Sequence, residues 1–191
     1  MSVKGTGPSA RDRLLAAADE LFYAEGVHSV GIDRVIEHAG VAKATLYNAF
    51  GSKDELVRAY LLRRHAARQE RVARKLDGLT SPRERLLAVF DALADAFAKP
   101  NFRGCAFVNA SAELAPGSRA AEVCDNARGW VRSLFRGLAL EAGAADPDLL
   151  ARQLVLLYDG ASVAAQLDHD TSSAMAARDV AAALLDVATV R

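Results

Sequence analysis

Residues 31–53 read GIDRVIEHAGVAKATLYNAFGSK, and this stretch decides the fold of the amino-terminal part of the chain. In its first half the apolar residues recur at helical spacing; they are Ile32, Val35, Ile36 and Ala39. Gly40 interrupts this pattern, and Leu46 and Phe50 then lie four residues apart in a second helical stretch that ends before Gly51. Two short helices joined by a glycine-containing turn have the connectivity of a helix-turn-helix.

The second of these helices has a polar side that suits contact with DNA. Val41 and Leu46 are expected to fill the space between the two helices. The side chains expected to point outward are Lys43, Ala44, Thr45, Tyr47 and Asn48. Small residues permit close approach to the major groove, and hydroxyl, amide and amine groups reach base edges or phosphates. The pattern favours a DNA-reading surface, and the alternative is a plain helical hairpin inside a bundle.

The flanking residues predict how these helices begin and what surrounds them. Upstream, Ser9 and Asp12 resemble a capping box for a first helix, and Gly26 ends it. Its apolar positions are Leu14, Leu15, Ala18, Leu21 and Phe22. Gly31 can cap the next helix, with Asp33 in its opening turn. Downstream, the capping box of Ser52 and Glu55 predicts a longer helix over residues 53–76.

The string GVAKATLYNAFGSKDELV, residues 40–57, resembles the signature of the TetR family of bacterial transcriptional regulators, which reads roughly A-G-V-S-K-G-T-L-Y-x-H-F-x-S-K-E-x-L. The resemblance spans about residues 9–60 and departs from the pattern at Ala42, Ala44 and Ala49, where serine, glycine and histidine are frequent. It implies a homodimer in which a three-helix head reads DNA and a variable helical body binds an inducer.

The resemblance also implies roles for single residues. By position, Lys43 and Thr45 resemble groove-facing residues, Tyr47 and Lys53 resemble phosphate contacts, and Leu46 and Phe50 resemble the core of the head. Threonine often caps the first helix of the motif and touches phosphate near Val30; Gly31 takes the capping position here without adding a hydroxyl.

The rest of the chain is predicted to be helical, because no segment alternates with period two for long enough to be a strand. Apolar periodicity and Gly or Pro breakers predict helices at about 82–98, 105–114, 119–142, 147–165 and 173–190. We therefore predict an all-α protein of about nine helices. Residues 1–8 are expected to be a disordered tail, 9–55 a helix-turn-helix DNA-binding domain, and 56–191 a helical-bundle domain for ligand binding and dimerisation.

Composition and charge exclude several classes of protein. The 191 residues contain 24 basic and 24 acidic side chains and have zero net charge, which argues against a nonspecific DNA-compacting protein. Basic residues concentrate between Arg58 and Lys75, a run that is either a polyanion-binding surface or a solvated helix face. Two cysteines are too few for a disulfide scaffold or a structural zinc site, and we expect no metal and no cofactor. Without an apolar leader or membrane span, a cytoplasmic protein is expected.

The last two helices predict self-association. Their apolar positions are rich in alanine, which leaves too little bulk to bury this hairpin within one subunit. Pairing with the same hairpin of a second copy is the natural remedy, and the TetR resemblance implies the same homodimer. Leu157 and Leu184 are candidates for the face toward the partner.

The body is larger than a reading head needs, which favours a site for a small, largely apolar effector that lowers DNA affinity. Candidates to line it are Cys105, Phe107, Trp130 and Tyr158. Each of these is alternatively a core residue, and Cys105 is alternatively a redox sensor.

An enzyme with Cys105 as nucleophile and a histidine as base is the rival from another class. The sequence has no phosphate loop, metal-spaced His/Glu pair or nucleophile elbow to support it. We therefore predict a transcriptional regulator, most often a repressor in this family, at a palindromic double-stranded operator.

Overall fold

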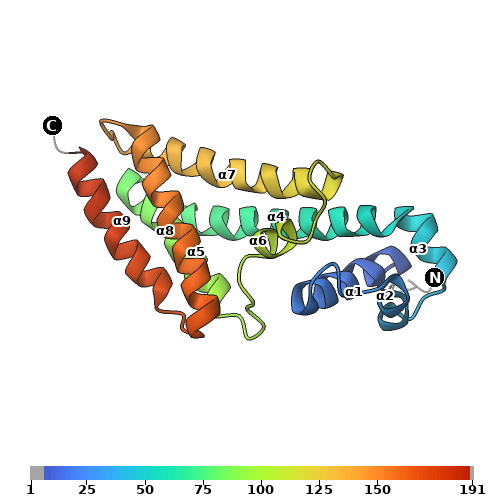
Figure 1. Ribbon diagram of the computed structural model, residues 1–191. Helices are drawn as coiled ribbons and strands as arrows, with labels where there is room; N and C mark the ends of the chain where they lie inside the picture. The colour runs from blue at the N-terminus through green and yellow to red at the C-terminus, as the bar shows by residue number, and fades with distance from the viewer. Residues whose placement is uncertain (1–6, 190–191) are drawn as a thin grey trace, which may run out of the picture. The chain divides into compact units, whose positions relative to one another are not determined.

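The computed structural model describes residues 7–189, and in this range it contains nine α-helices and no β-strand (Figure 1). They are α1 (Ala10–Glu25), α2 (Ile32–Ala39), α3 (Lys43–Phe50), α4 (Lys53–Leu76), α5 (Pro82–Phe97), α6 (Ala106–Ser111), α7 (Arg119–Glu141), α8 (Pro147–Asp168) and α9 (Ser173–Thr189). The all-α prediction is confirmed. Within 7–189 no helix is both long and apolar enough to cross a membrane. Most of the predicted tail, residues 1–6, lies outside the described residues.

The described chain forms two compact units. The first unit contains the residues up to 64 together with 106–124, and the second contains 65–105 and the residues from 125 onward. The long helices α4 and α7 therefore contribute to both units. The predicted functional boundary between residues 55 and 56 stays a prediction. The segment 106–124 was predicted to be part of the body, but it belongs to the first unit.

The first unit contains the predicted head, and its helix ends follow the capping pattern of the sequence. The backbone N–H of Asp12 donates to Ser9 Oγ at 3.1 Å, and Ser9 N–H donates to Asp12 Oδ2 at 3.3 Å. The hydroxyl of Ser9 also donates to Asp12 Oδ2 at 2.7 Å, and this bond, followed by the one from the Ser9 N–H, lowers the pKa of Asp12. The fully buried side chains of α1 and its neighbours form the core of this unit; they include Leu14, Ala18, Val30, Val35 and Leu46. Val30 is therefore a core residue, which explains why an apolar side chain stands beside the cap.

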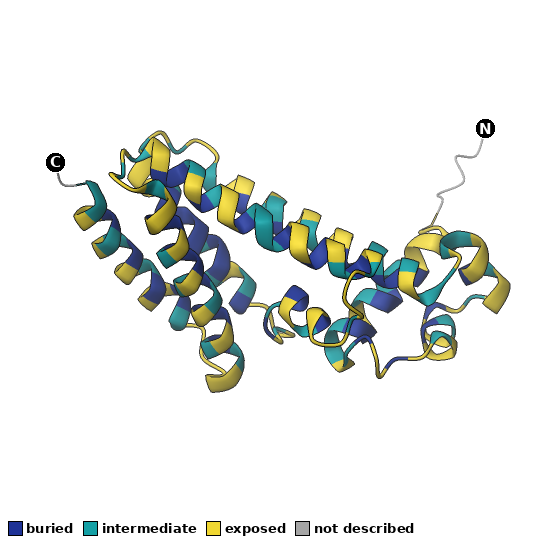
Figure 2. Ribbon diagram, turned by 45° about the horizontal axis from the view of Figure 1, so that its top comes forward, coloured by how far each residue is buried: buried dark blue, intermediate teal, exposed yellow. Residues whose placement is uncertain are grey.

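The second unit is built around α5, α8 and α9. Phe90 of α5 is fully buried, and its ring centroid lies 5.6 Å from that of Phe135 and 6.5 Å from that of Tyr158. Figure 2 shows the buried residues of α5, α8 and α9 gathered between these helices. Alanines lie where α8 and α9 meet: Ala161 and Ala165 on one helix and Ala174, Ala177 and Ala181 on the other are all buried. Small side chains let the two helices approach closely.

Most members of the basic run between Arg58 and Lys75 have partners within their own unit, so the run is not simply a solvated helix face. Arg64 pairs with Asp19 at 2.7 Å, and Lys75 pairs with Asp95 at 2.9 Å. Arg68 is buried and donates to the carbonyl of Ala127 at 2.9 Å. The run therefore serves mainly to connect α4 to its neighbours.

His65 gives the second unit a predictable pH dependence. Its ring lies edge-on to Trp130 with 5.6 Å between centroids, and burial, together with the charge of Arg68, lowers the pKa of His65 below its ordinary value. The unfolded chain therefore takes up this proton at a higher pH than the folded protein does. Stability is expected to fall as pH drops through about 6.5 toward the lower folded pKa of His65.

Thermal melts across this pH range should show a smaller fall in stability for His65→Gln than for wild type. His28→Gln, on the exposed surface, is the control; an unchanged fall in His65→Gln would contradict the prediction.

Candidate nucleic-acid interface

The turn between α2 and α3 is fixed by backbone hydrogen bonds. Gly40 takes up a left-handed conformation with φ 62°, which a residue with a side chain rarely adopts. Its N–H donates to the carbonyl of Glu37 at 3.1 Å, and the N–H of Val41 donates to the carbonyl of Ile36 at 3.2 Å. These two bonds close α2 and start the chain toward α3, with Leu46 fully buried beneath it. The predicted helix-turn-helix is therefore present in the first unit.

The face of α3 that was predicted to meet DNA is open to solvent. Lys43, Ala44, Tyr47 and Asn48 are exposed, and Thr45 is half-buried. Tyr47 is 45% exposed, a large fraction for an aromatic side chain. Ala42 occupies the N-cap without a side-chain hydrogen bond, so no capping side chain covers the first N–H groups of α3. Backbone N–H groups at a helix start can bind a phosphate oxygen.

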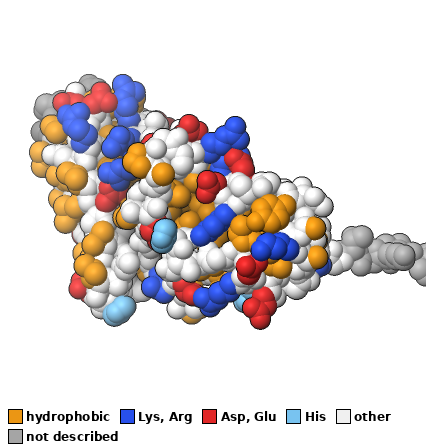
Figure 3. All heavy atoms as spheres, turned by 45° about the vertical axis from the view of Figure 1, so that its right-hand side comes forward, with side chains coloured by type: hydrophobic (Ala, Val, Ile, Leu, Met, Phe, Trp, Pro, Cys, Tyr) orange, Lys and Arg blue, Asp and Glu red, His pale blue; other side chains and the backbone are white. Residues whose placement is uncertain are grey.

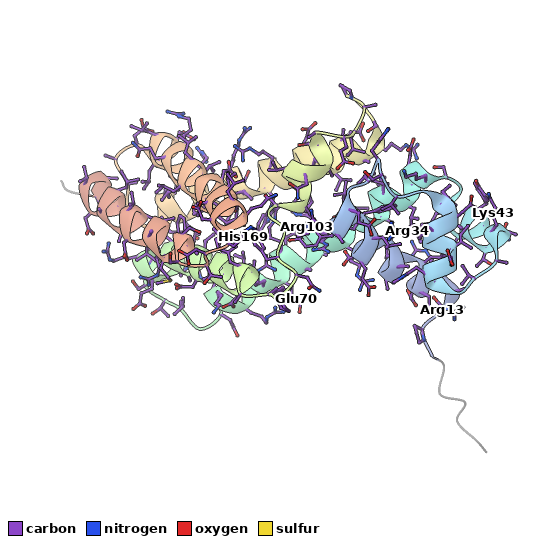
Figure 4. All side chains as sticks on the ribbon, turned by 60° about the horizontal axis from the view of Figure 1, so that its bottom comes forward. Arg13, Arg34, Lys43, Glu70, Arg103 and His169 are labelled. Carbon is purple, nitrogen blue, oxygen red and sulfur yellow. The ribbon has the colours of Figure 1, made fainter. Side chains whose placement is uncertain are left out.

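Charges around α3 are paired within the head. Lys43 Nζ lies 2.8 Å from Asp33 Oδ1, and this hydrogen bond and the charge of Asp33 raise the pKa of Lys43. On the neighbouring helix Arg34 forms an ion pair with Glu25. Figure 4 shows Arg13, Arg34 and Lys43, one on each helix of the head, and in Figure 3 basic and acidic side chains are interspersed on the face in view. The head therefore offers separate positive groups rather than one uniformly basic surface.

Two further predicted contacts lie at the edges of this face. Gly31 is exposed at the start of α2 and caps it without a side-chain hydrogen bond. Lys53, the first residue of α4, is half-buried at a crevice of about 150 Å³. Across this crevice the backbone N–H of His28 donates to Glu113 Oε2 at 2.6 Å. Glu113 also lies so close to Gly26 that a Cβ there would clash with its carboxylate.

The four residues predicted to line an effector pocket are divided between the two units. Phe107 is buried in the first unit, whereas Cys105, Trp130 and Tyr158 belong to the second. Tyr158 is buried, which raises the pKa of its hydroxyl, and Cys105 is close enough to add to this rise. Trp130 is half-buried beside His65. A groove of about 410 Å³ lies in the second unit, between α7 and α8, and none of these four residues lines it.

Sequence reasoning missed several residues of the head. Asp33 was assigned only to the opening turn of α2, yet its carboxylate holds Lys43. Arg11 lies over the ring of Phe50, 4.9 Å from its centroid, and Arg13 Nε donates to the carbonyl of Ala39 at 3.3 Å. The ten-residue separation of Lys43 and Asp33 gives no sequence signal, because it spans the turn. In residues 7–189 no group of three His, Cys, Asp or Glu side chains could hold a metal ion.

Comparison with known proteins decides the family. Residues 14–60 match the family model for bacterial regulatory proteins of the tetR family. Over 179 residues the chain is 30% identical to the transcriptional repressor NemR of Escherichia coli strain K12, which covers 87% of this chain and 88% of that protein. The chain belongs to the TetR family. This confirms the resemblance seen in the sequence and favours a regulator over the enzyme alternative.

Other TetR-family and helix-turn-helix relatives match to different extents. A TetR-family transcriptional regulator from Streptomyces coelicolor has a solved structure that superposes with a TM-score of 0.90 at 34% identity, covering 95% of this chain and 96% of that one. The transcriptional activator FasR of Mycolicibacterium smegmatis is 40% identical over 85 residues, 44% of this chain and 39% of that protein. The chain thus aligns with only about two fifths of the length of FasR. Both a repressor and an activator are among the relatives of this TetR-family chain.

Proposed function

We propose that this protein is a sequence-specific DNA-binding transcriptional regulator that acts as a homodimer at a roughly palindromic operator. The observation that carries this proposal is the helix-turn-helix of α2 and α3, with the exposed polar face of α3. A helix of this kind reads base edges in the major groove, and two-fold symmetry places the half-sites about one helical turn, ~34 Å, or a multiple apart. Membership of the TetR family supports the same function.

Apolar side chains exposed on α8 and α9 support the proposed dimer. On α8, Leu149, Leu156 and Val163 follow one another at seven-residue intervals, as do Val180 and Val187 on α9. A seven-residue interval returns to the same side of a helix after two turns. Exposed apolar rows of this kind mark an interaction surface. Leu157 and Leu184, the earlier candidates, pack against the core of their own subunit instead.

Repression controlled by a small molecule is the proposed mode of action, and the cytoplasm is the proposed location. Bound over a promoter, the dimer blocks transcription until an effector favours a conformation that fits DNA poorly. A tenfold fall in DNA affinity requires about 1.4 kcal/mol of differential binding. Because coupling is reciprocal, operator DNA weakens effector binding by the same factor.

Two variants, Trp130→Phe and Tyr158→Ala, test whether these residues line the predicted effector pocket. An effector that releases DNA from both variants as well as from wild type would show that neither residue is part of the site.

The proposed division of roles on the head is testable by substitution. Thr45→Ala and Lys43→Ala are expected to change which operator sequence is preferred, with about 1–3 kcal/mol lost at the base pair contacted. Tyr47→Phe and Lys53→Ala are expected to weaken binding to all sequences alike, and Lys53→Ala also to lower the salt dependence by about one charge. Fluorescence anisotropy with the operator and with single-base variants, at several salt concentrations, measures both effects.

Asp33→Asn complements Lys43→Ala, because it removes the ion-pair partner of Lys43 and keeps the ammonium group. We expect it to raise affinity for DNA severalfold, since the ion pair with Asp33 no longer competes with DNA. If Lys53→Ala changed base preference while Thr45→Ala did not, the assignment of roles would be wrong. If wild type bound no duplex more tightly than random DNA, the proposed function itself would fail.

A further inference from the structure

Two ion pairs connect α7 and α8 along the groove between them, one near each end, and among residues 7–189 no ion pair connects the two helices in the middle. At one end Arg128 of α7 pairs with Asp159 of α8, and at the other end Arg136 pairs with Asp148 at 2.7 Å. Higher numbers on one helix thus pair with lower numbers on the other, so the two helices run antiparallel along this groove. Arg132 lies halfway between the two paired arginines, one helical turn from each.

Opposite Arg132 the sequence supplies a positive charge instead of a carboxylate. By the register of the two ion pairs, Arg132 is level with residues 152–156 of α8, and both Arg132 and Arg152 line the groove. Among residues 7–189 neither of these arginines forms an ion pair with an acidic side chain. Two guanidinium groups facing one groove repel each other unless an anion lies between them. The middle of the groove is therefore suited to bind a negative group.

The floor of the same groove is apolar. Ala151 and Val155 are buried at its base, and Leu156 is exposed at its edge. The volume of about 410 Å³ lies within the range of about 300–1,000 Å³ that small-molecule sites occupy. An inorganic ion would leave this apolar surface uncovered, whereas an alkyl or aryl chain would cover it. Guanidinium groups bind carboxylates with two parallel hydrogen bonds, and the hydroxyl of Ser133 is a further donor.

We propose that this groove is a binding site for a small amphipathic organic anion, a carboxylate carried on an apolar chain. Arg132 and Arg152 bind the carboxylate, and Ala151 and Val155 contact the chain. The two flanking ion pairs bridge α7 and α8 and leave the central arginines for the ligand. The site is separate from the predicted pocket of Cys105, Trp130 and Tyr158, and the proposal does not depend on DNA binding.

Calorimetry with three probes tests this ligand class on the full-length protein alone. Octanoate is expected to bind saturably, with one molecule per chain. Octanol, which has the same chain without the charge, and inorganic phosphate, which has charge without the chain, are each expected to bind at least about tenfold more weakly. Equal binding of octanol would show that the arginines do not select the ligand. Equal binding of phosphate would show a counterion site only, and an absence of octanoate binding at millimolar concentration would overturn the proposal.

Substitutions locate the binding. Arg132→Ala and Arg152→Ala are each expected to weaken octanoate binding about tenfold, because each removes a charged hydrogen bond. Arg63→Ala, which removes one exposed charge from α4, is the matched control and should bind octanoate as wild type does. Sedimentation of each variant tests whether a second copy of the chain occupies the groove instead. If Arg132→Ala and Arg152→Ala bound octanoate normally but lost the dimer, a second copy of the chain would fill the groove and the proposal would be wrong. Operator binding measured in parallel keeps this outcome distinct from failure of the proposed function.

Discussion

Leu156→Glu is expected to convert the dimer into a monomer. Leu156 is 70% exposed in the single chain and lies at the centre of the row formed with Leu149 and Val163 on α8. Two-fold pairing of α8 and α9 would bring this side chain against the second subunit, where a carboxylate would be buried without a partner. Sedimentation at micromolar concentration should give about 40 kDa for wild type, twice the chain mass, and about 20 kDa for the variant.

Loss of the dimer should also remove most of the affinity for a palindromic operator. Two linked heads gain about 10²- to 10⁴-fold over one head, and the monomer forfeits this gain. Leu62→Glu is the control, because Leu62 is also exposed, at 41%, but belongs to α4 and not to the rows on α8 and α9. A Leu156→Glu protein that sediments as wild type does would place the dimer interface elsewhere. Leu157→Glu is a poorer test, because Leu157 packs against its own core and a charge there would also lower the stability of the monomer.

Leu46→Ala is expected to cost about 2–5 kcal/mol of stability in the head. Leu46 is fully buried and is the one buried side chain of α3, a helix of only eight residues. So short a helix is unstable alone and depends on packing against α1 and α2. A cavity at this position should therefore loosen α3 and abolish specific DNA binding. The dimer should persist, because its proposed contacts lie on α8 and α9.

Amide hydrogen exchange distinguishes this outcome from global unfolding. In Leu46→Ala we expect faster exchange over α2 and α3 and unchanged exchange over α5, α8 and α9. Leu62→Ala, which truncates an exposed leucine, should leave both exchange and DNA binding as in wild type. If Leu46→Ala kept full operator affinity, α3 would not depend on this packing, and its assignment as the reading helix would need to be reconsidered.

Much of the fold follows from local features of the sequence. Ser9 with Asp12, Gly40, and Asp146 with Pro147 mark helix ends through contacts that span only a few residues. Such signals act on neighbouring backbone groups and are present in the chain before any tertiary contact forms. For the same reason the helix-turn-helix could be predicted from residues 31–53 and matched to its family. Because Leu46 fixes which side of α3 is buried, the residues on the other sides of this short helix are exposed.

The side of each long helix that meets another helix could not be predicted in the same way. The run between Arg58 and Lys75 has seven basic residues and one acidic residue in the sequence, yet Arg68 is buried against Ala127, 59 residues away. Leu156 and Leu157 are adjacent leucines, and only packing decides that one is exposed and the other lies on the core. Apolar periodicity predicts a helix and its apolar side, but it does not predict which residue a charged side chain will contact.

What the sequence by itself determined is therefore the helical class, the reading head and the family, because each depends on residues within a few turns of one another. Only the tertiary structure decided that Asp33 holds Lys43, that residues 106–124 belong to the first unit, and that Arg132 and Arg152 share a groove in which neither pairs with a carboxylate. The physical reason is that the energy of a charge or an apolar side chain depends on what surrounds it. Those surroundings come from segments far apart in the chain, which meet only when it folds.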